Sequence, residues 1–199
     1  MPRFEPIPVD QLLPESRALI DAGIATGMYQ DGSGLPPSQL RVMAYSSVVL
    51  RATYAQQSAL WHQGLLDPRL RELVRIRSAQ VNGCDACAAA VKEPGVDAED
   101  LACMTVPGGG RLDDREVAAL DVVVKLGTEP ELIDERTLES LLELFSAAEV
   151  VELVYYACSM LGQHRFHHVF RSYEDGTPVL TFTPELVDAP LPQRIPAPS

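Results

Sequence analysis

The sequence predicts an all-α protein, and three observations support that prediction. Apolar residues recur at helical spacing along most of the chain up to about residue 171. Two helix-start patterns, in which a capping residue is followed three positions later by Glu, begin at Asp113 and Ser146. The β-branched run Val179–Thr183 near the C-terminus is too short to form a sheet alone. The expected architecture is therefore a helical bundle.

In the first half of the chain, turn residues separate the expected helices. Ser38 can cap a long helix, and Asp67 followed by Pro68 is typical of a helix start. Asn82 and Gly83 tolerate the left-handed backbone of a helix end. The expected helices span residues 14–28, 38–63 and 68–81, with a short one from Cys84 to about 93.

In the second half, helices are expected over about 114–126, 134–145 and 147–171. The last 27 residues hold six of the 16 prolines, which favours an extended arm over a second domain. We therefore expect one helical domain over 1–172 and an arm over 173–199. Within that arm, Leu180 and Phe182 would be exposed apolar groups unless the arm lies across a neighbouring subunit.

The charge balance excludes several classes of protein. With 16 Lys and Arg against 28 Asp and Glu, the formal net charge is −12, which argues against electrostatic binding of nucleic acid or an anionic membrane. No apolar stretch approaches the roughly 20 residues of a membrane helix. The first residues, with prolines and acids, are unlike an export signal. We expect a cytoplasmic protein, whose thiols are kept reduced except during turnover.

The informative motif is Cys84-Asp-Ala-Cys87, placed directly after the Asn82-Gly83 break. Residues three apart on a helix share a face, so the two sulfurs can reach each other. A helix start favours thiolate over thiol, and the thiolate is the nucleophile. Helix position favours Cys84 as the thiol of lower pKa, although burial could reverse that order. Metal binding is disfavoured because zinc needs four ligands and the other cysteines form no second close pair.

Twelve positions before Cys84 stands Glu72. On one unbroken helix this residue would lie about 120° from the cysteine face. A reversal at Asn82-Gly83 would let the two helices pack antiparallel and bring the carboxylate back beside the thiols. A buried Glu there could shuttle protons, with its pKa raised by desolvation. The alternative is a surface salt bridge with Arg69 or Arg75.

These residues resemble the carboxymuconolactone decarboxylase family, in its alkylhydroperoxidase-D-like branch. The resemblance is concentrated in residues 60–92. It implies an all-helical, oligomeric protein (a dimer, trimer or hexamer) without a cofactor. It also implies catalytic roles for Glu72, Cys84 and Cys87, with a hydroperoxide or other small molecule as substrate and a dithiol protein or small thiol as reductant.

The chain departs from that branch at one position. The branch motif places a histidine four residues after the second cysteine, and Val91 stands there. His62 is the candidate replacement in the proton relay. His164, His167 and His168 share a helix face, where a solvated helix end is favoured over a metal site.

Three functions remain open. The favoured one is a peroxiredoxin-type thiol peroxidase or disulfide oxidoreductase. The second is a decarboxylase of aromatic degradation, which does not require the dithiol. The third is a redox-sensing or non-catalytic family member, which the loss of the relay histidine favours. Of the remaining cysteines, Cys103 and Cys158 are expected to pack in the core.

Overall fold

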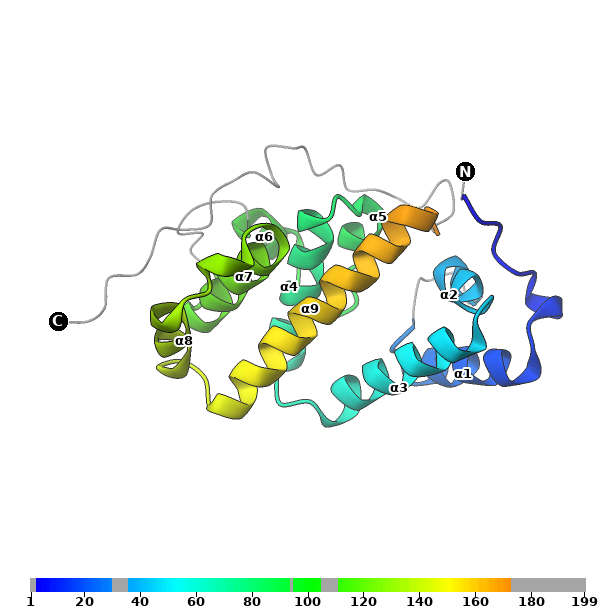
Figure 1. Cartoon of the computed structure of the whole chain (residues 1–199), viewed down its shortest axis with the longest axis horizontal. Coiled ribbons are helices and arrows are strands. Elements are labelled where there is room, and N and C mark those ends of the chain that lie inside the picture. The colour runs from blue at the N-terminus through cyan, green and yellow to red at the C-terminus, as the bar shows by residue number, and fades with distance from the viewer. Residues whose placement is uncertain (1–2, 30–35, 94, 105–110, 173–199) are drawn as a thin grey trace. The chain divides into compact units, whose positions relative to one another are not determined.

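The computed structural model describes residues 3–29, 36–93, 95–104 and 111–172, and within these every regular element is a helix (Figure 1). The predicted all-α class is confirmed. No helix in these ranges is both long and apolar enough to span a bilayer. The elements are η1 Val9–Gln11, α1 Pro14–Ala25, α2 Ser38–Met43, α3 Ser47–Gln63, α4 Pro68–Val81, α5 Asp85–Ala89, α6 Ala98–Cys103, α7 Asp114–Thr128, η2 Pro130–Leu132, α8 Glu135–Leu142 and α9 Ala147–Phe170.

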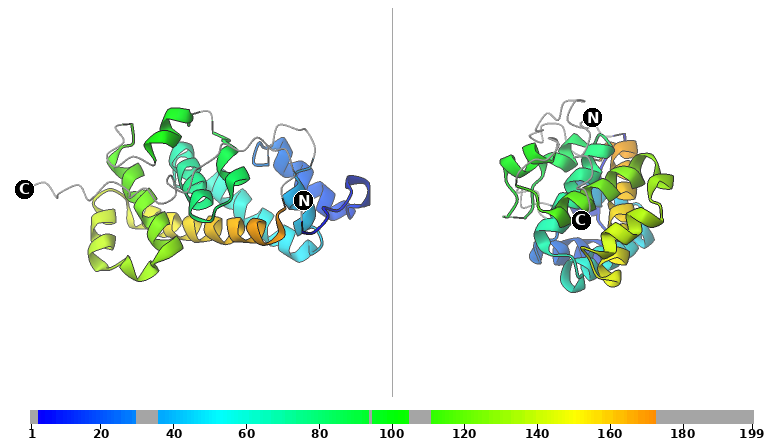
Figure 2. Two further views of the ribbon diagram at one scale, coloured as in Figure 1. Left: turned by 90° about the horizontal axis from the view of Figure 1, so that it is seen from above. Right: turned by 90° about the vertical axis from the view of Figure 1, so that its left-hand side faces the viewer.

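The chain divides into two compact units. The first contains residues up to Leu65 together with the segment from Arg165, and the second contains residues 66–164. Helix α9 is unbroken (Figure 2) and contributes to both. The prediction of one domain over 1–172 stays a prediction. The expected arm over 173–199 lies outside the described residues.

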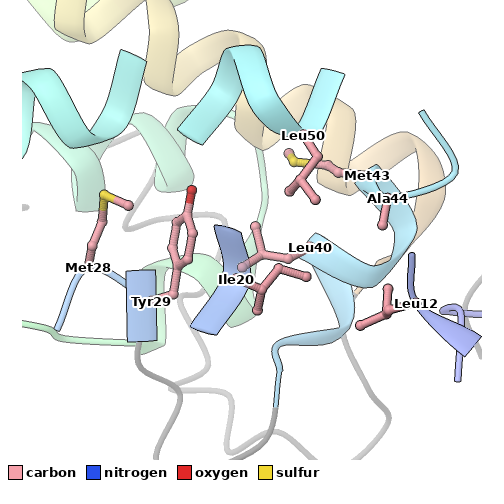
Figure 3. Packing of buried hydrophobic residues seen from close by; sticks show 8 residues of the cluster. All are labelled: Leu12, Ile20, Met28, Tyr29, Leu40, Met43, Ala44 and Leu50. Atoms are coloured by element: carbon pink, nitrogen blue, oxygen red, sulfur yellow. The ribbon is translucent and has the colours of Figure 1, made fainter. Parts of the chain in front are cut away.

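The core of the first unit forms between α1, α2 and α3 (Figure 3). Ile20 and Leu50 are fully buried there, and Tyr29 packs beside them. Tyr29 also approaches Gly23 closely, and a Cβ at that glycine would overlap the tyrosine ring. The unit therefore has an apolar core of its own. Its buried members are Leu12, Ile20, Met28, Tyr29, Leu40, Met43, Ala44 and Leu50.

The core of the second unit is built around α4, which packs against α5 and α7. Leu73 and Ile76 of α4 and Leu120 of α7 are fully buried. Every residue of α4 from Leu70 to Gln80 is buried. Because a helix buried on all sides has no solvent-facing stripe, its polar residues must find partners inside the protein. Those partners define the site described below.

Most predicted helix starts are confirmed. The Asp67 side chain accepts the N–H of Leu70 at 2.9 Å at the start of α4. Both predicted capping boxes form, at Asp113 and at Ser146, where the backbone N–H donates to Glu149 at 2.8 Å. These local patterns suffice because their hydrogen bonds lie within one helical turn.

The structure departs from the expected helices in two places. The single helix expected over 38–63 is divided into α2 and α3, and Ser46 rather than Ser38 caps the longer one. The hydroxyl of Ser38 instead donates to the backbone carbonyl of Ser172 at 2.8 Å, a contact between distant parts of the chain. Helix α6 was not predicted, although Asp97 and Asp100 form a capping box with Asp in the place of Glu.

Candidate functional site

The turn between α4 and α5 positions the two cysteines. Gly83 adopts φ 62°, a left-handed conformation that residues with a Cβ rarely occupy. The N–H of Gly83 donates to Gln80 at 3.0 Å, and the N–H of Cys84 donates to Ala79 at 2.9 Å. This pair of bonds is a Schellman motif, as the Asn-Gly sequence predicts. It fixes the backbone of Cys84 against the end of α4.

Cys84 and Cys87 are joined as a disulfide, with their Cα atoms 5.3 Å apart. Cys84 is the N-cap residue of α5, and its side chain makes no capping hydrogen bond. Cys84 is fully buried, whereas Cys87 is partly exposed. An external reactant therefore reaches Cys87 more readily than Cys84. Which of the two thiols has the lower pKa stays a prediction.

Glu72 is buried, with 2% of its surface exposed. Its carboxylate accepts two hydrogen bonds from Arg75, from Nε at 2.8 Å and from Nη2 at 2.7 Å. It also accepts the backbone N–H of Lys92 at 2.6 Å. The alternative interpretation, a salt bridge to Arg75, names the right partner, but the salt bridge is buried and not on the surface.

These contacts determine the charge state of the pair. Burial alone would raise the pKa of Glu72, but the hydrogen bonds and charge of Arg75 and the Lys92 N–H together bring that pKa below its ordinary value. The expectation of a raised pKa was therefore wrong. Burial likewise opposes the charge on Arg75, yet Glu72 raises the pKa of that guanidinium. Glu72 is a carboxylate and Arg75 a cation at neutral pH.

Arg75 also contacts the segment that carries the cysteines. Its Nη1 donates to the backbone carbonyl of Cys87 at 2.6 Å, and its Nη2 donates to the carbonyl of Ala90. The pairing of Glu72 with Lys92 and of Arg75 with Cys87 shows that the chain returns antiparallel to α4. The predicted reversal at Asn82-Gly83 is confirmed. The sequence did not identify Arg75 as a site residue, although its spacing from Glu72 marked it as a partner.

Three further polar side chains lie around the Glu72–Arg75 pair. Tyr156 of α9 is buried, which raises its pKa, and its hydroxyl lies within the electrostatic influence of both members of the pair. Arg71 and Glu93 form a second ion pair at 3.6 Å. Paired charges of opposite sign therefore lie near the dithiol segment, and of these Glu72, Arg75 and Arg71 are buried and Glu93 is partly exposed.

The histidines lie on helices α3 and α9. His62 lies exposed near the end of α3 in the first unit, so its role in a proton relay stays a prediction. Val91, at the position of the expected histidine, is 39% exposed. His164 is buried, and His167 Nδ1 contacts the Ser172 hydroxyl at 2.9 Å. Within the described ranges no three His, Cys, Asp or Glu residues could hold a metal together.

The other two cysteines are unpaired with each other and differ in exposure. Cys103 is partly exposed at the end of α6, and Cys158 is exposed on α9. The core position expected for Cys158 was therefore wrong. Val151 and Tyr155 are exposed on the same face of α9, so the apolar run around Cys158 does not mark a fully buried helix.

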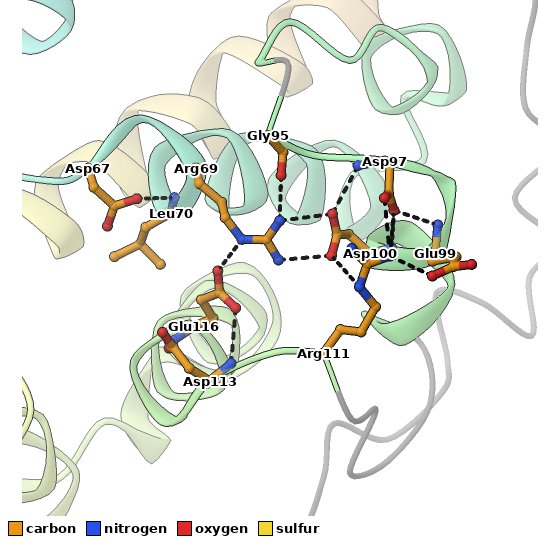
Figure 4. A network of polar contacts seen from close by, with 10 residues as sticks. All are labelled: Asp67, Arg69, Leu70, Gly95, Asp97, Glu99, Asp100, Arg111, Asp113 and Glu116. Carbon is orange, nitrogen blue, oxygen red and sulfur yellow. Dashed lines mark hydrogen bonds and ion pairs between the residues drawn. The ribbon is translucent and has the colours of Figure 1, made fainter.

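A second arginine of α4 forms a different polar cluster (Figure 4). Arg69 donates two hydrogen bonds to Asp100 at 2.8 Å and one to Glu116 at 2.6 Å. Glu116 also completes the capping box of α7 with Asp113. This cluster joins α4 to the starts of α6 and α7. Beside it lies a pocket of about 440 Å³, lined by Asp67, Arg69, Leu70, Arg111, Asp113, Arg115 and Glu116.

The sequence of this region matches the model of the carboxymuconolactone decarboxylase family over residues 48–104. The match covers 57 of the 199 residues. The match includes Glu72, Arg75, both cysteines of the disulfide and Val91. It confirms the family that the resemblance indicated. Neither the curated proteins nor the solved structures contain a match to the chain.

Proposed function

We propose that the protein is a thiol-dependent oxidoreductase that reduces hydroperoxides through Cys84 and Cys87. The observation that carries this proposal is the disulfide itself, formed by one buried and one partly exposed cysteine beside a buried ion pair. Membership of residues 48–104 in a family that includes thiol peroxidases supports it. The reduced and oxidised forms of such a pair interconvert without a cofactor.

The reaction follows from the exposure of the two sulfurs. The Cys87 thiolate attacks the hydroperoxide, the O–O bond breaks, and the alkoxide leaves and takes a proton to become an alcohol. Cys87 is then a sulfenic acid. The Cys84 sulfur attacks the Cys87 sulfur, the disulfide forms and water is released. The two thiols supply both electrons, and a dithiol reductant restores them by exchange.

Glu72 contributes charge and position in this scheme. A carboxylate whose pKa is lowered by Arg75 is a poor proton acceptor near neutral pH, so a shuttle role for Glu72 would need that pair to open. The exposed Val91 supplies no proton either. The proton for the leaving alkoxide then comes from water, and turnover is expected to be slow because acid–base help is worth about 10²–10⁴-fold.

The test is turnover of hydrogen peroxide and of an alkyl hydroperoxide with dithiothreitol as reductant. Turnover that is lost in Cys87→Ser and raised in Val91→His supports the proposal. Val91 is exposed, so the added histidine should not disturb packing.

The absence of a histidine at Val91 favours a second candidate, a redox-responsive protein that exchanges its disulfide without reducing peroxides. A readily reversible disulfide with no peroxide turnover in either protein would support it and overturn the first. Consumption of a muconolactone that Cys87→Ser leaves unchanged would instead establish the decarboxylase and overturn both.

A further inference from the structure

We propose that Arg75 is a positioning residue that holds the Cys84–Cys87 segment against Glu72 and stabilises the thiolate of Cys87 in the reduced protein. The inference depends on the proposed function only in taking Cys87 as the reactive thiol. Three bonding partners support it: the Glu72 carboxylate and the carbonyls of Cys87 and Ala90.

Helix α5 depends for its stability on contacts from outside the helix. This helix has five residues, too few to be stable in isolation. The last carbonyls of a helix lack partners within the helix, and a cation at that end is favourable. Arg75 supplies hydrogen-bond donors and a positive charge there, because its guanidinium donates to the carbonyls of Cys87 and Ala90 at the end of α5. When the disulfide is reduced and its covalent constraint is lost, these hydrogen bonds remain available to hold the segment.

Arg75 also changes the charge around Cys87. The Arg75 guanidinium lies 2.6 Å from the carbonyl oxygen of Cys87, so a positive charge adjoins the backbone of the reactive residue. A nearby cation favours thiolate over thiol. Glu72 opposes this effect with its negative charge, but it bonds to Nε and Nη2 of the guanidinium, whereas the carbonyl of Cys87 bonds to Nη1. The Nη1 end of the cation is therefore the part next to Cys87.

Among the side chains that the structure describes, charged or titratable groups around this segment include Arg71, Glu93, Tyr156 and Lys92. Arg71 and Glu93 balance each other at 3.6 Å. Tyr156 is neutral at physiological pH because burial raises its pKa. Lys92 adds a positive charge that also acts on Glu72. A change confined to Arg75 therefore alters the balance of charge nearest Cys87.

The test measures the pH dependence of iodoacetamide alkylation in the reduced full-length protein. Cys84, Cys103 and Cys158 are replaced by Ser, so that Cys87 alone reacts. Arg75→Gln should shift the midpoint upward by about one pH unit, which is about tenfold slower alkylation below the midpoint. Arg75→Lys, which keeps the charge and loses the planar fork, should shift it less.

Two further variants keep the test decisive. The double variant Glu72→Gln/Arg75→Gln leaves no unpaired buried charge, so it should fold even if Arg75→Gln alone does not. The midpoint of its alkylation by pH should lie between those of the parent protein and of Arg75→Gln. The matched control is Arg69→Lys, on the same helix but bonded to Asp100 and Glu116. It should leave the midpoint unchanged.

An unchanged midpoint in the folded Arg75 variants would overturn the inference. So would an equal shift in Arg69→Lys, because that would show a general effect of destabilising α4. The measurement contains no hydroperoxide, so a failure of peroxidase activity leaves it interpretable. As a second readout, the dithiol of the variant carrying Glu72→Gln and Arg75→Gln should have a more negative reduction potential than the unaltered protein, because its reduced form loses thiolate stabilisation.

Discussion

Arg69 and Arg75 of α4 lie less than two helical turns apart and donate similar hydrogen bonds, but we assign them different roles. Each arginine donates two hydrogen bonds of 2.7–2.8 Å to one carboxylate. Arg69 is 30% exposed in its side chain, and its carboxylate partners belong to the starts of α6 and α7. Arg75 is 9% exposed, and its remaining donors reach the segment that carries the disulfide.

The difference shows what a buried ion pair can do besides stabilise a fold. The Arg69 cluster connects helix caps, and the donors and acceptors described for it are used within the protein, so we interpret it as structural. A buried pair is costly to desolvate and often adds little net stability. The hydrogen bonds that Arg75 donates to the backbone carbonyls of Cys87 and Ala90 give the buried Glu72–Arg75 pair a functional role that stability alone does not. The following predictions test this division between a structural and a functional arginine.

The largest effect is expected from removing the reactive sulfur. Cys87→Ser should lower hydroperoxide turnover by at least about 10³-fold, since the nucleophile is lost. Cys158→Ser, which alters an exposed thiol elsewhere on the chain, should leave turnover within experimental error. The measurement is steady-state turnover with dithiothreitol. Equal loss in both variants would mean that the two cysteines of the disulfide have no special role.

The next largest effect concerns the stability of the functional pair. Arg75→Met leaves Glu72 buried without its partner and should lower the free energy of unfolding by about 3–5 kcal/mol. Adding Glu72→Gln removes the uncompensated charge and should recover most of that loss. Urea unfolding followed by circular dichroism gives both values. If Arg75→Met alone costs under about 1 kcal/mol, the pair is not buried as described.

The structural cluster should respond to acid. The hydrogen bonds of Arg69 lower the pKa of Asp100 to about 2. The pKa of Asp100 is lower in the folded than in the unfolded protein. The ionised Asp100 therefore stabilises the fold fully above about pH 4, and this stabilisation is lost as the pH falls toward 2. Its contribution is about 1–2 kcal/mol. Asp100→Asn should flatten this part of the pH–stability curve, although Glu149, with a pKa also lowered to about 2, keeps some slope. An identical curve in the variant would contradict the assignment.

The smallest effect concerns the turn before the cysteines. Gly83→Ala should cost about 1 kcal/mol, because φ is 62° and no neighbour lies within 4 Å of the added Cβ, so the strain is confined to the backbone. Gly95→Ala is the matched control, since its Cβ also meets nothing and its φ is not positive. That variant should be neutral or slightly stabilising. Thermal unfolding of the two proteins makes the comparison.

Local sequence signals predicted most of the fold and half of the candidate site. The Asn82-Gly83 turn and the capping boxes at Asp113 and Ser146 depend on contacts within a few residues, and all of them form. Ser38 is not a cap, because it is the first residue of α2 after the N-cap Pro37, and its hydroxyl donates to the distant carbonyl of Ser172. A hydrogen bond between residues so far apart in the sequence cannot be predicted from the local spacing of residues.

The same limit explains the error at Glu72. Its position beside the dithiol segment followed from the chain reversal, but its pKa depends on which donors surround it. Arg75 at helical spacing was visible, whereas the N–H of Lys92 arrives only through the tertiary fold. Cys158 was misplaced for a related reason, since an apolar helix can be buried on one face and exposed on the other.

The central claim is that Cys84 and Cys87 form a dithiol that a hydroperoxide oxidises directly. It is tested by mixing the reduced protein with one equivalent of hydroperoxide and following thiol loss by stopped flow. We expect two thiols to disappear per hydroperoxide, the product to be the Cys84–Cys87 disulfide, and the reaction to be faster than that of free dithiothreitol at the same pH. Oxidation no faster than the free dithiol, or unchanged in Cys87→Ser, would contradict it.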